Sequence, residues 1–90
     1  MFTGIIEKIG KVSHVTEKNI SQVIGIRIED FNSALGDSIC INGVCLTVED
    51  IDDNIYSFSI SPETYNLSNF KNIKKNDDVN IEKSLTINKL

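Results

Sequence analysis

The sequence predicts an all-β fold, a small closed antiparallel barrel of six strands with one short helix. Isoleucine is abundant, and much of it stands in short segments where apolar and polar residues alternate, which favours sheet over helix. Turn residues separate these segments at short intervals, a spacing typical of barrels and sandwiches. Ninety residues are enough for one such domain, and closure would remove exposed strand edges.

Alternation assigns the strands, and clusters of polar residues and glycine assign the turns between them. The first strand is long enough to bend near Gly10, and a polar turn over 17–19 ends it. The expected strands cover residues 2–15, 23–29, 39–41, 44–48, 55–60 and 78–83. The apolar residues expected to face the core are Ile24, Ile26, Ile28, Val44, Leu46, Val48, Tyr56, Phe58, Ile60, Val79 and Ile81.

Ser61 is expected to begin the single helix. Its side chain can cap the helix, Pro62 suits the first helical position, and Glu63 favours the positive end of the helix dipole. The helix should be short and end near Asn69.

The most informative segment is a hairpin over 39–48, two apolar strands joined by Asn42-Gly43. Asn-Gly accepts positive φ at both central positions of a type I′ turn, whose twist matches the flanking strands. Side chains alternate after the turn, so Cys45 and Thr47 should face away from the core, side by side. Packing alone does not require a thiol and a hydroxyl there.

The same turn sets Cys40 opposite Cys45 in a non-hydrogen-bonded pair, whose side chains are close. A cross-strand disulfide is geometrically conceivable, but a cytosolic compartment keeps thiols reduced, so we expect two free cysteines. Two thiols and the distant His14 make a poor zinc site, and we expect no metal. His14 itself is expected to be an exposed strand-end residue without a role.

The formal net charge of −4 excludes the basic surface that nucleic-acid binding requires. Lys74-Lys75 is too small a cluster for anionic lipid, and no apolar run is long enough to span a bilayer. The N-terminus lacks a charged-then-apolar secretory pattern. We therefore expect a soluble, cytoplasmic protein that binds neither nucleic acid nor membrane.

Three separated motifs stand out: Met1-Phe2-Thr3-Gly4-Ile5, Asn42-Gly43-Val44-Cys45-Leu46-Thr47-Val48 and Glu63-Thr64. In their order and spacing they resemble the N-terminal barrel of riboflavin synthase. The resemblance covers residues 1 to about 83 and implies a six-stranded Greek-key closed barrel. Some members carry a second Cys where this chain has Val44; this residue should face the core, so the departure leaves binding unaffected.

The resemblance implies an enzyme in which two molecules of 6,7-dimethyl-8-ribityllumazine exchange a four-carbon unit, giving riboflavin and 5-amino-6-ribitylaminouracil. No metal or redox cofactor is needed. Orientation of two stacked heterocycles should supply much of the rate, with acid–base groups moving protons. Riboflavin synthases have two barrels in tandem, so residues 1–90 are expected to be one lumazine-binding barrel with the second absent. The family's site lies between barrels of neighbouring subunits, which leaves half a site here.

The resemblance also implies site residues in this chain. Those expected to bind ligand are Gly4, Ile5, Ile6, Cys45, Leu46, Thr47, Ser59, Ile60, Ser61, Pro62, Glu63 and Thr64. Those expected to act in catalysis are Phe2, Ser38, Cys45 and Thr47. Gly4 would let a flat ring approach the backbone. Backbone donors and acceptors at strand edges would hydrogen-bond the pyrimidine-dione, and Thr47, Ser61 and Thr64 would bind the ribityl hydroxyls.

Several of these residues also have an ordinary structural explanation. Cys45 could be a buried, inert thiol, and Ser38 could bond local backbone. Glu63 is equally well explained as a partner of the helix dipole. Phe2 could be a frayed terminal residue, although the resemblance favours an apolar contact near the reacting rings. The role of Thr3 is open.

Three functions are compatible with the sequence. The first is a riboflavin synthase domain that binds lumazine or riboflavin and turns over poorly alone. The second is a non-catalytic flavin or lumazine carrier, like the fluorescent lumazine proteins. The third, a generic interaction module, leaves the three motifs unexplained.

The resemblance and the apolar rim together predict how the chain assembles. We expect the isolated domain to form a homodimer, because an apolar rim around Phe2 and Ile5 would otherwise face water. The full two-barrel enzyme is expected to be a homotrimer, with lumazine synthase as a candidate partner.

Overall fold

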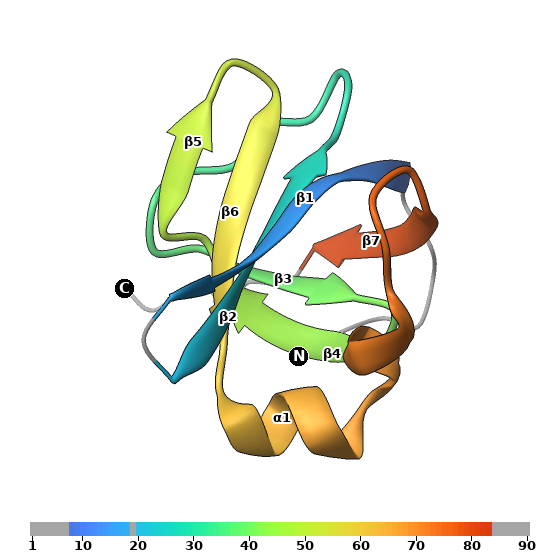
Figure 1. Ribbon diagram of the computed structural model, residues 1–90. Helices are drawn as coiled ribbons and strands as arrows, with labels where there is room; N and C mark the ends of the chain where they lie inside the picture. Colours follow the sequence, from blue (N-terminus) through green and yellow to red (C-terminus); the bar gives the residue numbers. More distant parts are fainter. Residues whose placement is uncertain (1–7, 19, 84–90) are drawn as a thin grey trace.

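Short β-branched strands and tight turns build most of the molecule. The computed structural model describes residues 8–18 and 20–83, which form one curled antiparallel sheet with a short helix (Figure 1). The strands are β1 (Lys8–Lys18), β2 (Ser21–Arg27), β3 (Ser38–Ile41), β4 (Val44–Thr47), β5 (Asp50–Asp52), β6 (Ile55–Ile60) and β7 (Asp78–Lys83). The helices are α1 (Pro62–Leu67) and the 3-10 turn η1 (Asn69–Asn72).

The strand order is β4-β3-β7-β1-β2-β6-β5, and each neighbouring pair is antiparallel. The last strand, β7, returns to lie between β1 and β3. The two ends of this order, β4 and β5, are consecutive in the chain, so the sheet curls until β4 approaches β6 (Figure 1). The all-β prediction is confirmed.

Two details of the predicted barrel are wrong for the part of the chain that the structure describes: the sheet has seven strands, and it is open. The expected strand over 44–48 ends early because the backbone changes partner. Val48 still hydrogen-bonds Asp37 and Gly36 on the β3 side, whereas the N–H of Glu49 donates to the Ser57 carbonyl on β6. The extra strand β5 follows from this change, and the outer edge of β4 is left without a strand partner among the described residues.

The first strand also differs from its prediction. Glu17 and Lys18 were expected in a turn. In the structure they extend β1 and pair with Gln22 and Ser21 of β2, so the paired part of this hairpin is longer than predicted. The predicted strand positions 2–7 lie outside the described residues.

His14 is not the exposed strand-end residue that the sequence predicts. It lies within β1, next to a register irregularity between Val12 and His14, and is half-buried. Its ring fills the space where a Cβ on Gly25 would stand, so the absence of a side chain at Gly25 makes room for the imidazole.

The predicted core is confirmed. All the described residues expected to face inward are buried except Val44, which is half-buried and packs against the core. Phe58, with no exposed surface, is the largest fully buried side chain. Tyr56 is anchored at one end of the core, because its hydroxyl donates to the Phe31 carbonyl at 2.8 Å and its ring meets the Phe31 ring edge-on.

The helix begins as predicted. The Ser61 hydroxyl accepts from the Thr64 N–H at 3.2 Å, and Pro62 occupies the first turn. α1 ends two residues before the predicted Asn69, because the Ser68 hydroxyl donates to the Thr64 carbonyl at 2.6 Å and accepts from the Phe70 N–H, which starts η1. Phe70 is thereby buried in the core.

Candidate functional site

On one side of β4, backbone hydrogen-bonding groups have no strand partner in the part of the chain that the structure describes. Both the N–H and the carbonyl of Val48 bond toward the β3 side. Because backbone groups alternate in direction along a strand, those of Cys45 and Thr47 point to the opposite side. No other strand among residues 8–18 and 20–83 pairs with that side of β4.

The facing strand β6 presents a matching free edge. Its Ser57 carbonyl accepts from the Glu49 N–H at 2.9 Å, so Ser59, two residues later, directs its backbone groups to the same side. β5 pairs only with residues 55–57 and stops before Ser59. The backbone groups of Cys45, Thr47 and Ser59 thus border one gap between β4 and β6, which we name the β4–β6 edge.

Side chains at this edge follow the predicted alternation. Cys45 and Thr47 are exposed, Ser59 is partly exposed, and Ser38 stands directly opposite Thr47 in the β3–β4 register. The exposure of Cys45 excludes its explanation as a buried, inert thiol. The structure therefore brings Ser38, Cys45 and Thr47 together on one surface.

The two thiols of the hairpin differ in environment. Cys40 pairs with Cys45 as the turn predicts, and both thiols are free. Cys40 is buried, and this burial raises the pKa of its thiol; the nearby Glu82 carboxylate acts in the same direction, while the Gly43 N–H opposes it. Cys40 is therefore a neutral, unreactive thiol at neutral pH, and Cys45 is the one that a ligand can touch.

The start of α1 lies directly after β6. The Ser61 hydroxyl donates to the Thr64 hydroxyl at 3.1 Å while it caps the helix, so both groups already have partners that a ligand would have to share. Pro62 and Glu63 are exposed in the first turn. Leu46 and Ile60 are buried, and their backbone groups point toward β3 and β2 and not into the gap. The remaining predicted site residues, Phe2, Gly4, Ile5 and Ile6, lie outside the described residues, as does Thr3.

Glu49 is a site residue that the sequence reasoning missed. The Ser59 hydroxyl donates to its carboxylate at 2.7 Å, which ties the end of β4 to β6 across the gap. Glu49 stands two residues after Thr47, and that spacing is the only sequence signal for it. The signal is weak, because nothing local shows that the chain changes partner at residues 48 and 49.

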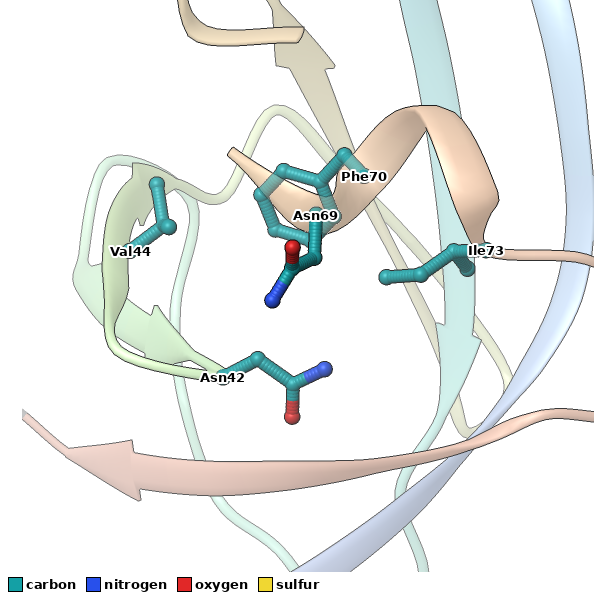
Figure 2. Close-up of a pocket in the computed structure, with 5 residues that line it drawn as sticks. All are labelled: Asn42, Val44, Asn69, Phe70 and Ile73. Carbon is teal, nitrogen blue, oxygen red and sulfur yellow. The ribbon is translucent and has the colours of Figure 1, made fainter. Parts of the chain in front are cut away.

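Three pockets lined by described residues lie away from this edge. The pocket in Figure 2, between Asn42 and the residues of η1, has about 10 Å³ of space, enough for about one water; it is lined by Asn42, Val44, Asn69, Phe70 and Ile73. Two open pockets of about 150 and 320 Å³ lie around Lys11 and Arg27. The candidate site is therefore an exposed strand edge, not one of these three hollows.

The described segments lack two further kinds of site, a metal-binding cluster and a membrane-spanning helix. They contain no group of three His, Cys, Asp or Glu residues placed to hold a metal ion. Their helices are too short to cross a membrane.

Comparison with known proteins gives a family match and related proteins of similar length to this chain in the matched region. The lumazine binding domain family matches residues 3–84. Riboflavin synthase of Bacillus amyloliquefaciens is 34% identical over 90 residues, covering 98% of this chain and 42% of that protein. Riboflavin synthase of Meyerozyma guilliermondii is 43% identical over 98 residues, covering 94% of this chain and 40% of that protein. The chain spans about two fifths of the length of these curated relatives.

Solved structures share the fold. LumP complexed with 6,7-dimethyl-8-(1'-D-ribityl) lumazine superposes with a TM-score of 0.86 at 30% identity, covering 92% of this chain and 49% of that one. LumP complexed with riboflavin gives a TM-score of 0.85 at 25% identity, covering 100% of this chain and 50% of that one.

Proposed function

Since the chain belongs to the lumazine binding domain family, we propose that it is the N-terminal lumazine-binding domain of a riboflavin synthase. Its ligands are ribityl-substituted heterocycles, 6,7-dimethyl-8-ribityllumazine and riboflavin, bound at the β4–β6 edge. The observation that carries the proposal is the backbone of Cys45, Thr47 and Ser59, which no strand among residues 8–18 and 20–83 pairs on the side of the gap.

The chemistry of this edge matches the ligand. A pyrimidine-dione presents carbonyl acceptors on either side of an N–H donor, and an unpaired strand edge presents donors and acceptors in alternation. The hydroxyls of Ser38, Thr47 and Ser59 surround the edge and suit a polyhydroxylated ribityl chain. Binding of this kind requires no metal or redox cofactor.

In the parent enzyme the domain would contribute half of a two-ligand site. Cys45, Thr47 and Ser38 would contact the heterocycle and help steer a nucleophile, and Phe2 would add an apolar contact. A second barrel would present the other lumazine with its own acid–base groups. Because a misplacement of about 1 Å can lower a rate by ~100-fold, riboflavin formation by this domain alone should be close to background.

We also propose that the isolated domain pairs with a second copy of itself, because half a composite site exposes surface that the other half would cover. Sedimentation at high concentration should show a species near twice the 10.0 kDa chain mass. A monomer at every concentration would refute the pairing and leave ligand binding untouched.

A second candidate function is that of a ligand carrier without catalysis. It is favoured by the structural neighbours, because LumP is seen with a lumazine, with riboflavin and with flavin mononucleotide. Both functions need the same binding edge. They are separated by assaying riboflavin formation by the complete product of the gene that encodes this chain: turnover supports the enzyme, and ligand binding without turnover supports the carrier.

Binding itself is tested by titrating the purified chain into riboflavin and into 6,7-dimethyl-8-ribityllumazine and following ligand fluorescence. We expect saturable quenching or enhancement with both ligands. No change at millimolar protein or ligand would refute the proposed function.

A further inference from the structure

Glu49 places a carboxylate beside the proposed ligand edge. It is exposed, and its carboxylate accepts from the Ser59 hydroxyl at 2.7 Å, while its N–H donates to the Ser57 carbonyl at 2.9 Å. The backbone and the side chain of Glu49 are therefore both held to β6 by hydrogen bonds. A carboxylate has room for about four hydrogen bonds, so acceptor positions are left over for a ligand.

The surroundings of Glu49 are acidic. Asp50, Asp52 and Asp53 follow it along β5 and its turn, and all are exposed. The ion pairs of the described residues join Lys11 to Asp78 and Arg27 to Glu29, and none involves Glu49. Its negative charge is therefore not neutralised by a neighbouring lysine or arginine in this part of the chain.

We propose that Glu49 determines ligand specificity at the β4–β6 edge, favouring a neutral ribityl chain over a ribityl phosphate. This inference rests on the proposed function. A ribityl hydroxyl donates a hydrogen bond to a carboxylate, which strengthens binding. A phosphate monoester carries a charge of about −1.5 to −2 at pH 7 and presents mainly acceptors, so it is repelled by the Glu49 carboxylate.

The test compares riboflavin with flavin mononucleotide, which differ only in the phosphate. Dissociation constants for both are measured by fluorescence titration for the native chain and for Glu49→Gln. Glutamine keeps the size and an acceptor for Ser59 but removes the charge. We expect the native chain to favour riboflavin by about tenfold or more, and Glu49→Gln to reduce this preference by about tenfold, mainly by tightening flavin mononucleotide; tenfold corresponds to about 1.4 kcal/mol.

Asp52→Asn is the matched control, because it removes one exposed carboxylate at the far end of the β5–β6 hairpin, where Asp52 pairs with Ile55. It should change the preference by less than about threefold, since exposed charges are screened within roughly 8 Å at physiological salt. Raising the salt concentration should also improve flavin mononucleotide binding to the native chain more than to Glu49→Gln. A merely structural role of Glu49 would weaken both ligands alike.

The outcomes separate the two claims. Riboflavin binding with an unchanged preference in Glu49→Gln, or with an equal change in Asp52→Asn, would overturn the specificity role alone. Failure of the native chain to bind either ligand would refute the proposed function and this inference with it. Urea unfolding of both variants confirms that they are folded at the titration temperature.

Discussion

Replacement of Thr47 by Val should weaken ligand binding without weakening the fold. Thr47 is exposed on β4, and its hydroxyl has no hydrogen-bond partner among the described residues. Valine keeps the β-branched shape that strands favour, so the free energy of unfolding should change by less than about 0.5 kcal/mol. Loss of one neutral hydrogen bond to the ribityl chain is worth about 0.5–1.5 kcal/mol, which raises the dissociation constant about two- to tenfold.

The assay for Thr47→Val is riboflavin titration by fluorescence, with urea unfolding measured on the same preparation. Thr16→Val is the control, because Thr16 is an exposed threonine on β1, which β2 separates from β6. Its dissociation constant should stay within twofold of the native value. Unchanged binding by Thr47→Val, or equal weakening by both variants, would show that the Thr47 hydroxyl does not contact ligand.

Three further outcomes follow from the fold. Tyr56→Phe should lower the free energy of unfolding in urea by about 0.5–1.5 kcal/mol, because the partly buried Phe31 carbonyl loses its 2.8 Å hydrogen-bond donor; no change would contradict that bond. Gly25→Ala should destabilise by about 1–3 kcal/mol through collision with the His14 ring, and adding His14→Ala should recover part of this loss, whereas strict additivity would argue against the contact. Cys45 should react with a thiol reagent much faster than Cys40 in the native chain, as followed by mass spectrometry. Because burial raises the pKa of Cys40, its thiol should gain reactivity only above the ordinary thiol pKa. Equal reaction rates of the two thiols would contradict their difference in exposure.

The parts of the fold that local chemistry determines could be predicted from the sequence. The Asn42-Gly43 turn has positive φ at both residues, which sets the β3–β4 register and the outward direction of Cys45 and Thr47. The capped start of α1 at Ser61 is equally local. Period-two alternation then identified the inward-facing residues of β2, β4, β6 and β7.

The parts that depend on distant partners could not be predicted. Val48 and Glu49 are adjacent in the chain, yet one bonds toward β3 and the other to β6, and no residue type marks that change. The seventh strand, the open edge of β4 and the place of Glu49 beside Ser59 all follow from it. The His14 ring over Gly25 is likewise a contact between strands, which alternation within one strand does not reveal.

The central claim, that ribityl ligands bind at the β4–β6 edge, is tested most directly by mapping backbone amide shifts in NMR spectra during riboflavin titration. The account predicts that the amides of Cys45, Thr47 and Ser59 shift most and gain protection from exchange, because their N–H groups border the gap. Amides at the β1–β2 tip, such as Thr16, should stay in place. Saturable binding with the largest shifts around the open pockets at Lys11 and Arg27, and none at Cys45, Thr47 and Ser59, would contradict it.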